Sequence, residues 1–185
     1  MGDGFQFLYF IRVGSCGSWL LHFSFLLCYT PVMPNETAKS FLEKTCFPVR
    51  LAATDKKGVL AELVERLIAS GALPSSFRDT ALAALREREA KMSTGMQLGI
   101  AIPHAKIDGI SGMVAGLALS SDGVPFDSLD GLSAQIFIIT ISPLDEIGTH
   151  VRFLADISQL LANDSRRLAL LSAETGEAML KALFD

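Results

Sequence analysis

Histidine, the side chain that most readily changes protonation near neutral pH, occurs three times in this sequence, as His22, His104 and His150. His104 follows an apolar run and a proline in the segment Gly-Ile-Ala-Ile-Pro-His-Ala (99–105). Pro103 fixes its own φ angle and biases the residue before it toward an extended backbone. The sequence therefore predicts an imidazole presented with little local freedom, which suits a nucleophile.

His150 follows an apolar, β-branched run (134–141) and a short loop, Pro-Leu-Asp-Glu-Ile-Gly (143–148). This order places His150 in the first turn of the helix after a strand. Open α/β sheets commonly bind their ligands at the carboxyl ends of strands. His150 is therefore a second candidate site residue.

A third group of candidates precedes His104. Arg86 and Arg88 lie near the end of a predicted helix, and Ser93-Thr94-Gly95 follows it. Guanidinium groups, hydroxyls and backbone N–H groups on a glycine-containing loop are donors suited to a phosphoryl group. Each feature also has an ordinary structural explanation, because arginine favours helix C-termini, Ser-Thr-Gly often ends a helix, and a lone histidine is often simply half-buried. Spacing alone leaves both explanations open.

The hydrophobic pattern predicts the elements that must position these residues. Helices are expected over 37–44, from an Asp55 cap to Gly71, from a capping box at Ser76 and Asp79 through Arg88, and over 149–162 and 175–184. Strands are expected over 47–51, 99–102, 113–119 and 134–141. The last of these is nearly continuously apolar, as in a central strand covered on both faces. The predicted fold class is α/β, a small mixed β-sheet with helices packed on both faces, in a single domain.

Residues 1–34 differ from the rest of the chain, with two charged side chains and eight of the fifteen aromatic residues. The longest apolar run there is too short to span a membrane, and a basic start with a small-residue cleavage site is missing. We interpret 1–34 as a hydrophobic N-terminal extension outside the fold, with Met33 as a candidate start, and 35–185 as the domain. A peripheral hydrophobic arm and a membrane or export segment are the alternatives.

Charge and cysteine content exclude several classes of protein. The net charge of −4 has the wrong sign for attraction to phosphate backbones, so no nucleic-acid partner is expected. The three cysteines, Cys16, Cys28 and Cys46, form neither a disulfide framework nor a four-cysteine zinc site. A reducing, cytoplasmic compartment is predicted.

The order of these motifs resembles a known family. Arg88-Glu89, Ser93-Thr94-Gly95, the 99–105 segment, Gly-Val-Pro-Phe-Asp (123–127) and His150 together resemble the EIIA domain of the fructose–mannitol class (type 2) of the phosphoenolpyruvate-dependent sugar phosphotransferase system. The nitrogen-regulatory branch of that class shares the pattern. The resemblance covers about 35–185.

This resemblance implies a phosphotransferase that acts as a phosphoryl carrier. His104 corresponds to the histidine that accepts a phosphoryl group from the phosphohistidine of HPr and passes it to an EIIB domain. His150 corresponds to the family's second active-site histidine and Arg88 to its phosphate-contacting arginine, while Ser93 and Thr94 are expected to add weaker phosphoryl-binding donors. No metal or other cofactor is implied, and the membrane is reached only indirectly, through a transporter.

Met96-Gln97-Leu98 departs from the family pattern, which commonly has Ile-Gly and a short polar residue there. This change leaves partner choice open. Met96, Leu98, Ile107 and Phe126 are candidates for an apolar rim that contacts partner proteins, although each also suits the core.

There are three alternatives to a sugar-transport carrier. The first stays within the family that the sequence resembles and is a nitrogen-type regulatory phosphoprotein that signals by its phosphorylation state. The second is a metal-binding or hydrolytic domain that uses His104 and His150 with Asp145 or Glu146. The third is a non-catalytic relic, for which the altered 96–98 loop is the one hint.

Overall fold

The structure, a computed structural model, describes residues 34–43, 45, 47 and 50–185. The predicted extension 1–34 therefore lies outside the described residues except for Pro34, the first residue of helix α1 (Pro34–Leu42).

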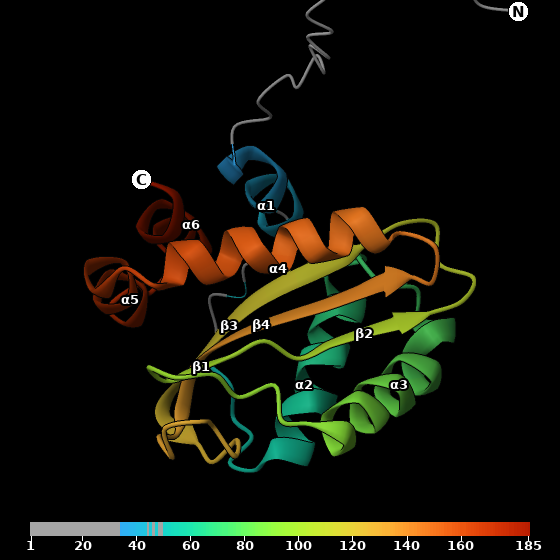
Figure 1. The fold of residues 1–185 in the computed structure, drawn as a ribbon, viewed down its shortest axis with the longest axis horizontal. Helices are drawn as coiled ribbons and strands as arrows, with labels where there is room; N and C mark the ends of the chain where they lie inside the picture. The colour runs from blue at the N-terminus through green and yellow to red at the C-terminus, as the bar shows by residue number, and fades with distance from the viewer. Residues whose placement is uncertain (1–33, 44, 46, 48–49) are drawn as a thin grey trace, which may run out of the picture. The chain divides into compact units, whose positions relative to one another are not determined.

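Strand β4 (Ala134–Pro143) is the centre of the sheet. Along one edge it pairs in parallel with β1 (Ile100–Ala101) and then with β2 (His104–Ile107), and along the other it pairs antiparallel with β3 (Val114–Val124) (Figure 1). This arrangement confirms the predicted mixed sheet with 134–141 as its central strand.

Pro103 divides the edge beside β4 into two short strands. The sequence predicted one strand over 99–102 that ends at the proline, but the chain resumes pairing immediately afterwards, and His104 opens β2. The proline has no N–H to donate to the sheet, although its carbonyl still accepts a hydrogen bond from the Thr140 amide at 3.0 Å. His104 thereby lies beside Thr140 in the register of the sheet.

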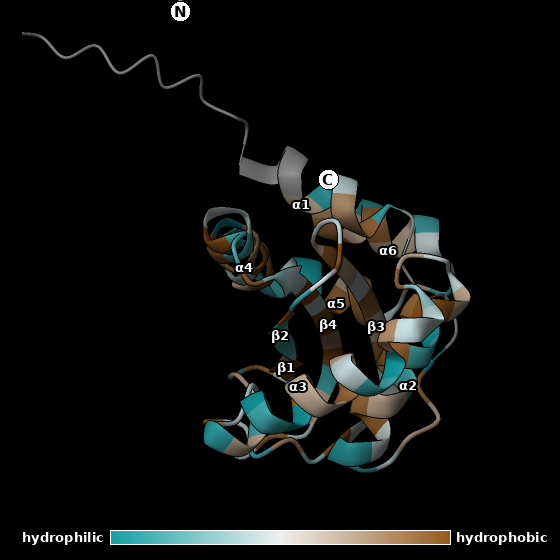
Figure 2. Ribbon diagram, turned by 90° about the vertical axis from the view of Figure 1, so that its right-hand side faces the viewer, coloured by the Kyte–Doolittle hydropathy of each residue, from teal (hydrophilic) through white to brown (hydrophobic). Residues whose placement is uncertain are grey.

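Helices cover both faces of the sheet, as predicted. Helices α2 (Lys56–Ala69) and α3 (Arg78–Lys91) lie on one face, and α1, α4 (Ile147–Leu161), α5 (Asp164–Leu171) and α6 (Gly176–Phe184) lie on the other (Figure 1). Alternate residues of β4 enter two separate cores, because successive side chains of a strand point to opposite faces. Phe137, Ile139 and Ile141 pack under α2 and α3, whereas Ile136 and Ile138 pack under α4. Figure 2 shows the apolar strands between the two helical layers.

Of the two helix N-termini for which the sequence predicted a side-chain cap, the structure confirms one. Asp55 caps α2 as predicted, since its Oδ1 accepts a hydrogen bond from the Gly58 amide at 2.8 Å. The prediction of a capping box at Ser76 and Asp79 is wrong. Ser75–Phe77 form a 3₁₀ turn, η1, and α3 begins at Arg78 without a side-chain cap, because the chain is already turning when it leaves Pro74.

Two further segments differ from the expectation. The predicted strand over 47–51 is not a strand where it is described, but the amides of Phe47 and Leu51 donate to carbonyls of β3 along its outer edge. Helix α5, which the sequence analysis did not separate, begins where Asn163 caps the amide of Arg166.

Leu98 in the 96–98 loop has a left-handed backbone, with φ of 66°. An L residue with a bulky side chain is strained there by roughly 1–2 kcal/mol, whereas asparagine tolerates this region. The Leu98 amide donates to Asp130 at 2.7 Å, which holds the loop in place. The side chain is 50% exposed, so packing recovers only part of the strain.

We therefore expect Leu98→Asn to raise the unfolding free energy by up to about 1 kcal/mol, because asparagine adopts the same left-handed backbone conformation with less strain than leucine. Urea denaturation with a linear extrapolation measures the change. Gln97→Asn is the matched control, because Gln97 is not among the described residues with positive φ and should gain nothing. A lower stability of Leu98→Asn would show that the apolar contacts of Leu98 outweigh its strain.

Candidate active site

His104 is held by a backbone carbonyl two residues before it. Its Nδ1 lies 2.8 Å from the carbonyl oxygen of Ile102. A carbonyl can only accept, so Nδ1 must carry the proton, and in the neutral ring Nε2 keeps its lone pair. The Ile-Pro-His geometry thus selects one tautomer and leaves a lone pair on Nε2.

Burial keeps this imidazole neutral. The partly buried position of His104 lowers its pKa below the ordinary value, and the positive charge of Arg88 lowers it further, against the opposing effects of the Ile102 hydrogen bond and the Glu89 charge. A neutral imidazole is the form that attacks phosphorus.

Arg88 approaches His104 from the last turn of α3. Its Nε donates to Nε2 of His104 at 3.1 Å, and its Nη1 donates to the carbonyl of Met92 at 2.8 Å. The second bond fixes the plane of the guanidinium beside Nε2 of His104. The structure therefore brings together the two residues that the sequence analysis placed sixteen positions apart.

His150 lies in the first turn of α4, as predicted. The imidazole rings of His104 and His150 are neighbours, with their centroids 5.5 Å apart. Nδ1 of His150 lies 2.9 Å from Oγ of Ser142 on β4. Burial lowers the pKa of His150 to about 4, and the charges of Lys106, Arg88 and, when it is protonated, His104 act in the same direction. This ring is neutral at physiological pH.

The hydroxyls of Ser93 and Thr94 are bonded to Glu89. Thr94 donates from its backbone N at 3.0 Å and from Oγ1 at 2.5 Å to one carboxylate oxygen, and Ser93 Oγ donates to the other at 3.1 Å. Ser93 Oγ also bonds the Phe126 carbonyl at 2.5 Å. In this arrangement the two side chains support the loop after α3, and a direct contact with a phosphoryl group stays a prediction.

Lys56 completes this support and was not identified from the sequence. Its ammonium lies 2.7 Å from Glu89 and from Asp127, and 4.8 Å from the centre of the Phe126 ring. Burial of Glu89 favours its neutral form, but hydrogen bonds from Lys56 and Thr94 outweigh burial and hold its pKa below the ordinary value. A lysine one residue after a helix cap carries no spacing pattern, so only the folded chain reveals this ion pair.

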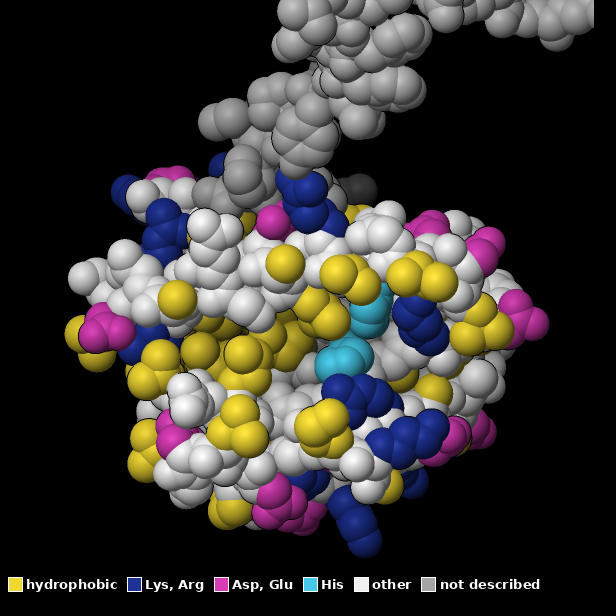
Figure 3. Space-filling model, in the orientation of Figure 1, with side chains coloured by type: hydrophobic (Ala, Val, Ile, Leu, Met, Phe, Trp, Pro, Cys, Tyr) yellow, Lys and Arg dark blue, Asp and Glu magenta, His cyan; other side chains and the backbone are white. Residues whose placement is uncertain are grey.

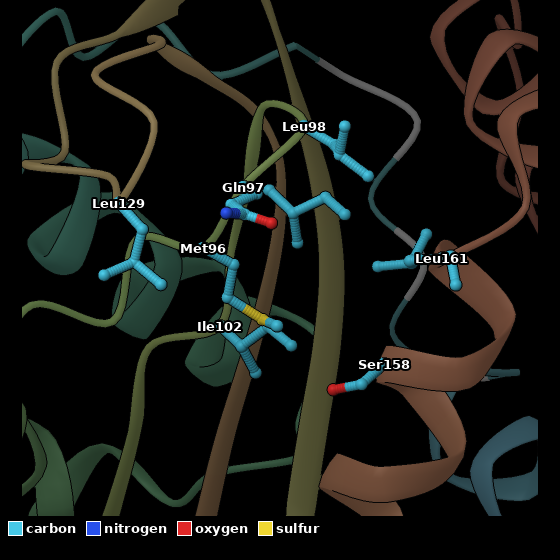
Figure 4. A pocket seen from close by; sticks show the side chains of 9 residues that line it. Met96, Gln97, Leu98, Ile102, Leu129, Ser158 and Leu161 are labelled. Carbon is cyan, nitrogen blue, oxygen red and sulfur yellow. The ribbon is translucent and has the colours of Figure 1, made fainter.

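The candidate site opens onto one face of the molecule. Figure 3 shows the two imidazoles next to each other, His104 half-buried and His150 almost completely buried, with apolar side chains on one side and Lys and Arg on the other. Beside them lies an apolar hollow of about 180 Å³, lined by Met96, Gln97, Leu98, Ile100, Ile102, Leu129, Ser158, Leu161 and Ala162 (Figure 4). Of the four rim candidates, Leu98 and Met96 line this hollow, whereas Ile107 and Phe126 are buried in the core.

Among the described residues no three His, Cys, Asp or Glu side chains gather as a metal site would require. None of the helices in the same ranges is long and apolar enough to cross a membrane.

Residues 40–185 match the family model described as the phosphoenolpyruvate-dependent sugar phosphotransferase system, EIIA 2. The fructose-specific EIIA component of Haloferax volcanii is 33% identical over 70% of this chain and 83% of its own length. The nitrogen regulatory protein of Pseudomonas aeruginosa is 31% identical over 74% of this chain and 88% of its own length. The fructose-specific EIIABC component of Bacillus subtilis is 32% identical over 75% of this chain, which spans only 22% of that longer protein.

Solved structures share the fold. The nitrogen regulatory protein IIA-Ntr of Neisseria meningitidis superimposes with a TM-score of 0.66 at 23% identity, covering 78% of this chain and 97% of that one. Mannitol enzyme IIA of Escherichia coli, in a complex with phosphorylated enzyme IIB, superimposes with a TM-score of 0.60 at 19% identity, covering 76% of this chain and 94% of that one. Together with the family match, these relatives show that the chain belongs to the type 2 EIIA family of the phosphoenolpyruvate-dependent sugar phosphotransferase system and is a phosphotransferase component.

Proposed function

We propose that this protein carries a phosphoryl group on Nε2 of His104, accepting it from the phosphohistidine of HPr and passing it to an EIIB domain. The observation that carries the proposal is the pair of bonds on one ring, Nδ1 to the Ile102 carbonyl and Nε2 to Arg88. They define a neutral nucleophile with a permanent cation beside its lone pair.

The transfer itself needs little covalent chemistry from the protein. The lone pair of Nε2 forms a bond to phosphorus while the phosphorus–nitrogen bond of the donor breaks, and the electron pair returns to the donor imidazole. Charge is spread over the peripheral oxygens of the transferring group, so positioning and positive donors dominate the rate. Passing the group to an EIIB domain is the same exchange in the opposite sense.

Arg88 supplies the main charge in this proposal. As the phosphoryl group approaches Nε2, the N–H group that Arg88 aims at that nitrogen is in place to bond a phosphoryl oxygen instead. Lysine cannot reproduce the planar fork of donors. The Met92 carbonyl keeps the guanidinium in position during the exchange.

A nitrogen-type regulatory role is the second candidate. The relative from P. aeruginosa, which matches over most of both chains, favours it. Both roles use the same phosphorylated histidine in the cytoplasm, where HPr is expected, and they differ in the partner that responds. Transfer from the phosphorylated chain to purified EIIB domains, compared with binding to regulatory targets, separates them.

The nucleophile is tested by incubating the protein with phosphoenolpyruvate, enzyme I and HPr. We expect the wild type to gain one acid-labile phosphoryl group by intact-protein mass, and His104→Ala to gain none. His150→Gln should still gain the group, though more slowly, because it keeps His104 and changes only the neighbouring ring. Full labelling of His104→Ala, or an unmodified wild type beside fully phosphorylated HPr, would refute the proposal.

Replacing Arg88 with lysine keeps the charge and removes the fork of donors. We expect Arg88→Lys to slow phosphoryl uptake by roughly 100-fold, in the range found when one transition-state donor is lost. Rapid-quench kinetics with phospho-HPr measure the rate. Arg86→Lys is the control, since Arg86 is exposed and two residues earlier on the same helix. Similar rates for both variants would contradict the role of Arg88.

The neutral state of His150 predicts a pH-dependent stability. Its folded pKa is about 4 and its unfolded value is 6.5, so the unfolded chain binds the proton first as the pH falls. Its stabilising contribution is complete above about pH 6.5 and disappears toward pH 4. Lowering the pH from 8 to 5 should therefore reduce the unfolding free energy of the wild type by about 2 kcal/mol through this group. Denaturant titrations at pH 8 and pH 5 measure this change. The fall in unfolding free energy should be smaller in His150→Gln than in the wild type by about 2 kcal/mol, and equal falls in the two proteins would contradict the prediction.

A further inference from the structure

Strand β4 presents two hydroxyls to the face that α4 covers. Thr140 and Ser142 follow Ile136 and Ile138 at intervals of two, and both are completely buried. Ser142 Oγ bonds Nδ1 of His150 at 2.9 Å, whereas the hydroxyl of Thr140 has no hydrogen-bond partner among the described residues. A serine thus reaches the second histidine from the centre of the sheet.

The proton in the Ser142–His150 bond can be placed by elimination. Among the described residues, Nδ1 of His150 is the one hydrogen-bond partner of Ser142 Oγ. If Nδ1 donated the proton, the serine hydrogen would be buried without an acceptor, which is unfavourable. The serine therefore donates and Nδ1 accepts. Because the ring is neutral, its single proton lies on Nε2.

His104 has the opposite tautomer. Its Nδ1 carries the proton that the Ile102 carbonyl accepts, and its Nε2 has the lone pair. The two neighbouring rings therefore differ in function at the same atom: Nε2 of His104 can attack, and Nε2 of His150 can donate a hydrogen bond. Phosphoryl oxygens only accept hydrogen bonds, so the donor tautomer is the one that favours a phosphorylated neighbour.

We propose that Ser142 is a positioning residue that holds His150 as the Nε2–H tautomer, so that His150 donates a hydrogen bond to the phosphoryl group on His104. The proposal rests on the proposed function for the identity of the acceptor. Without Ser142, Nδ1 and Nε2 of His150 would compete for the proton. The fraction of rings ready to donate would fall although no group that contacts the phosphoryl has been removed.

The tautomer is read directly by NMR. In the ¹⁵N-labelled full chain, long-range ¹H–¹⁵N correlation spectra at pH 7.5 should show His150 protonated at Nε2 and unprotonated at Nδ1, and His104 the reverse. Ser142→Ala should introduce the Nδ1–H form of His150, and Ser142→Thr, which keeps a hydroxyl, should restore the wild-type pattern. Thr140→Val is the matched control, because it removes an equally buried hydroxyl on the same strand face, one that makes no hydrogen bond to His150.

Kinetics provide the second measurement. With phospho-HPr as donor, Ser142→Ala should lower kcat roughly tenfold and leave KM unchanged, as expected when one hydrogen bond of the transition state is weakened. Thr140→Val should behave as wild type, and Ser142→Ala should cause no further loss in a His150→Gln background.

Two outcomes would overturn the role of Ser142. One is a His150 ring protonated at Nδ1 in the wild type, and the other is a tautomer that Ser142→Ala leaves unchanged. A wild type that takes no phosphoryl group from HPr would instead refute the proposed function, and the spectra would still decide whether Ser142 sets the tautomer.

Discussion

The site depends on a single backbone carbonyl. Because the oxygen of Ile102 can only accept, it fixes the proton of His104 on Nδ1 and leaves Nε2 available. Pro103 lies between β1 and β2, and because it has no N–H it interrupts the pairing along this edge of the sheet just before His104. The rest of the site adds to this contact: Arg88 faces the lone pair, and the second histidine lies beside the ring.

Glu89 plays a comparable part beneath the surface. It is adjacent in sequence to Arg88, its side chain is 7% exposed, and it receives hydrogen bonds from Lys56, Ser93 and Thr94. The Thr94 carbonyl in turn accepts a hydrogen bond from the amide of Ile102. Thr94 therefore links the buried carboxylate of Glu89 to Ile102, the residue whose carbonyl fixes His104. An ionised acid that is so fully bonded stabilises the arrangement, whereas the same acid without partners would destabilise it.

Periodicity and motif order predicted much of this molecule. The apolar run of β4 predicted the central strand, the spacing of Val59, Leu60, Leu63, Val64 and Leu67 predicted α2, and His104, His150 and Arg88 lie close together as the resemblance implied. The ion pair of Lys56 was missed because its partners are far away in the sequence. Ser142 was missed because a serine at the end of a β-branched run is compatible with a strand, and nothing in the pattern links it to His150. The predicted helix cap at Ser76 was wrong because Ser76 lies inside the 3₁₀ turn that follows Pro74.

The half-buried His104 and its buried neighbour His150 face the same side of the molecule, and this limits how partners can reach them. In the proposed function, a donor and an acceptor must both reach Nε2 of His104, and they cannot occupy this face at the same time. Each must leave before the other binds, so the carrier alternates between a charged and a discharged form and obeys double-displacement kinetics. Spent donor then competes with the acceptor for the charged form, so the concentration of each partner relative to its affinity affects the flux.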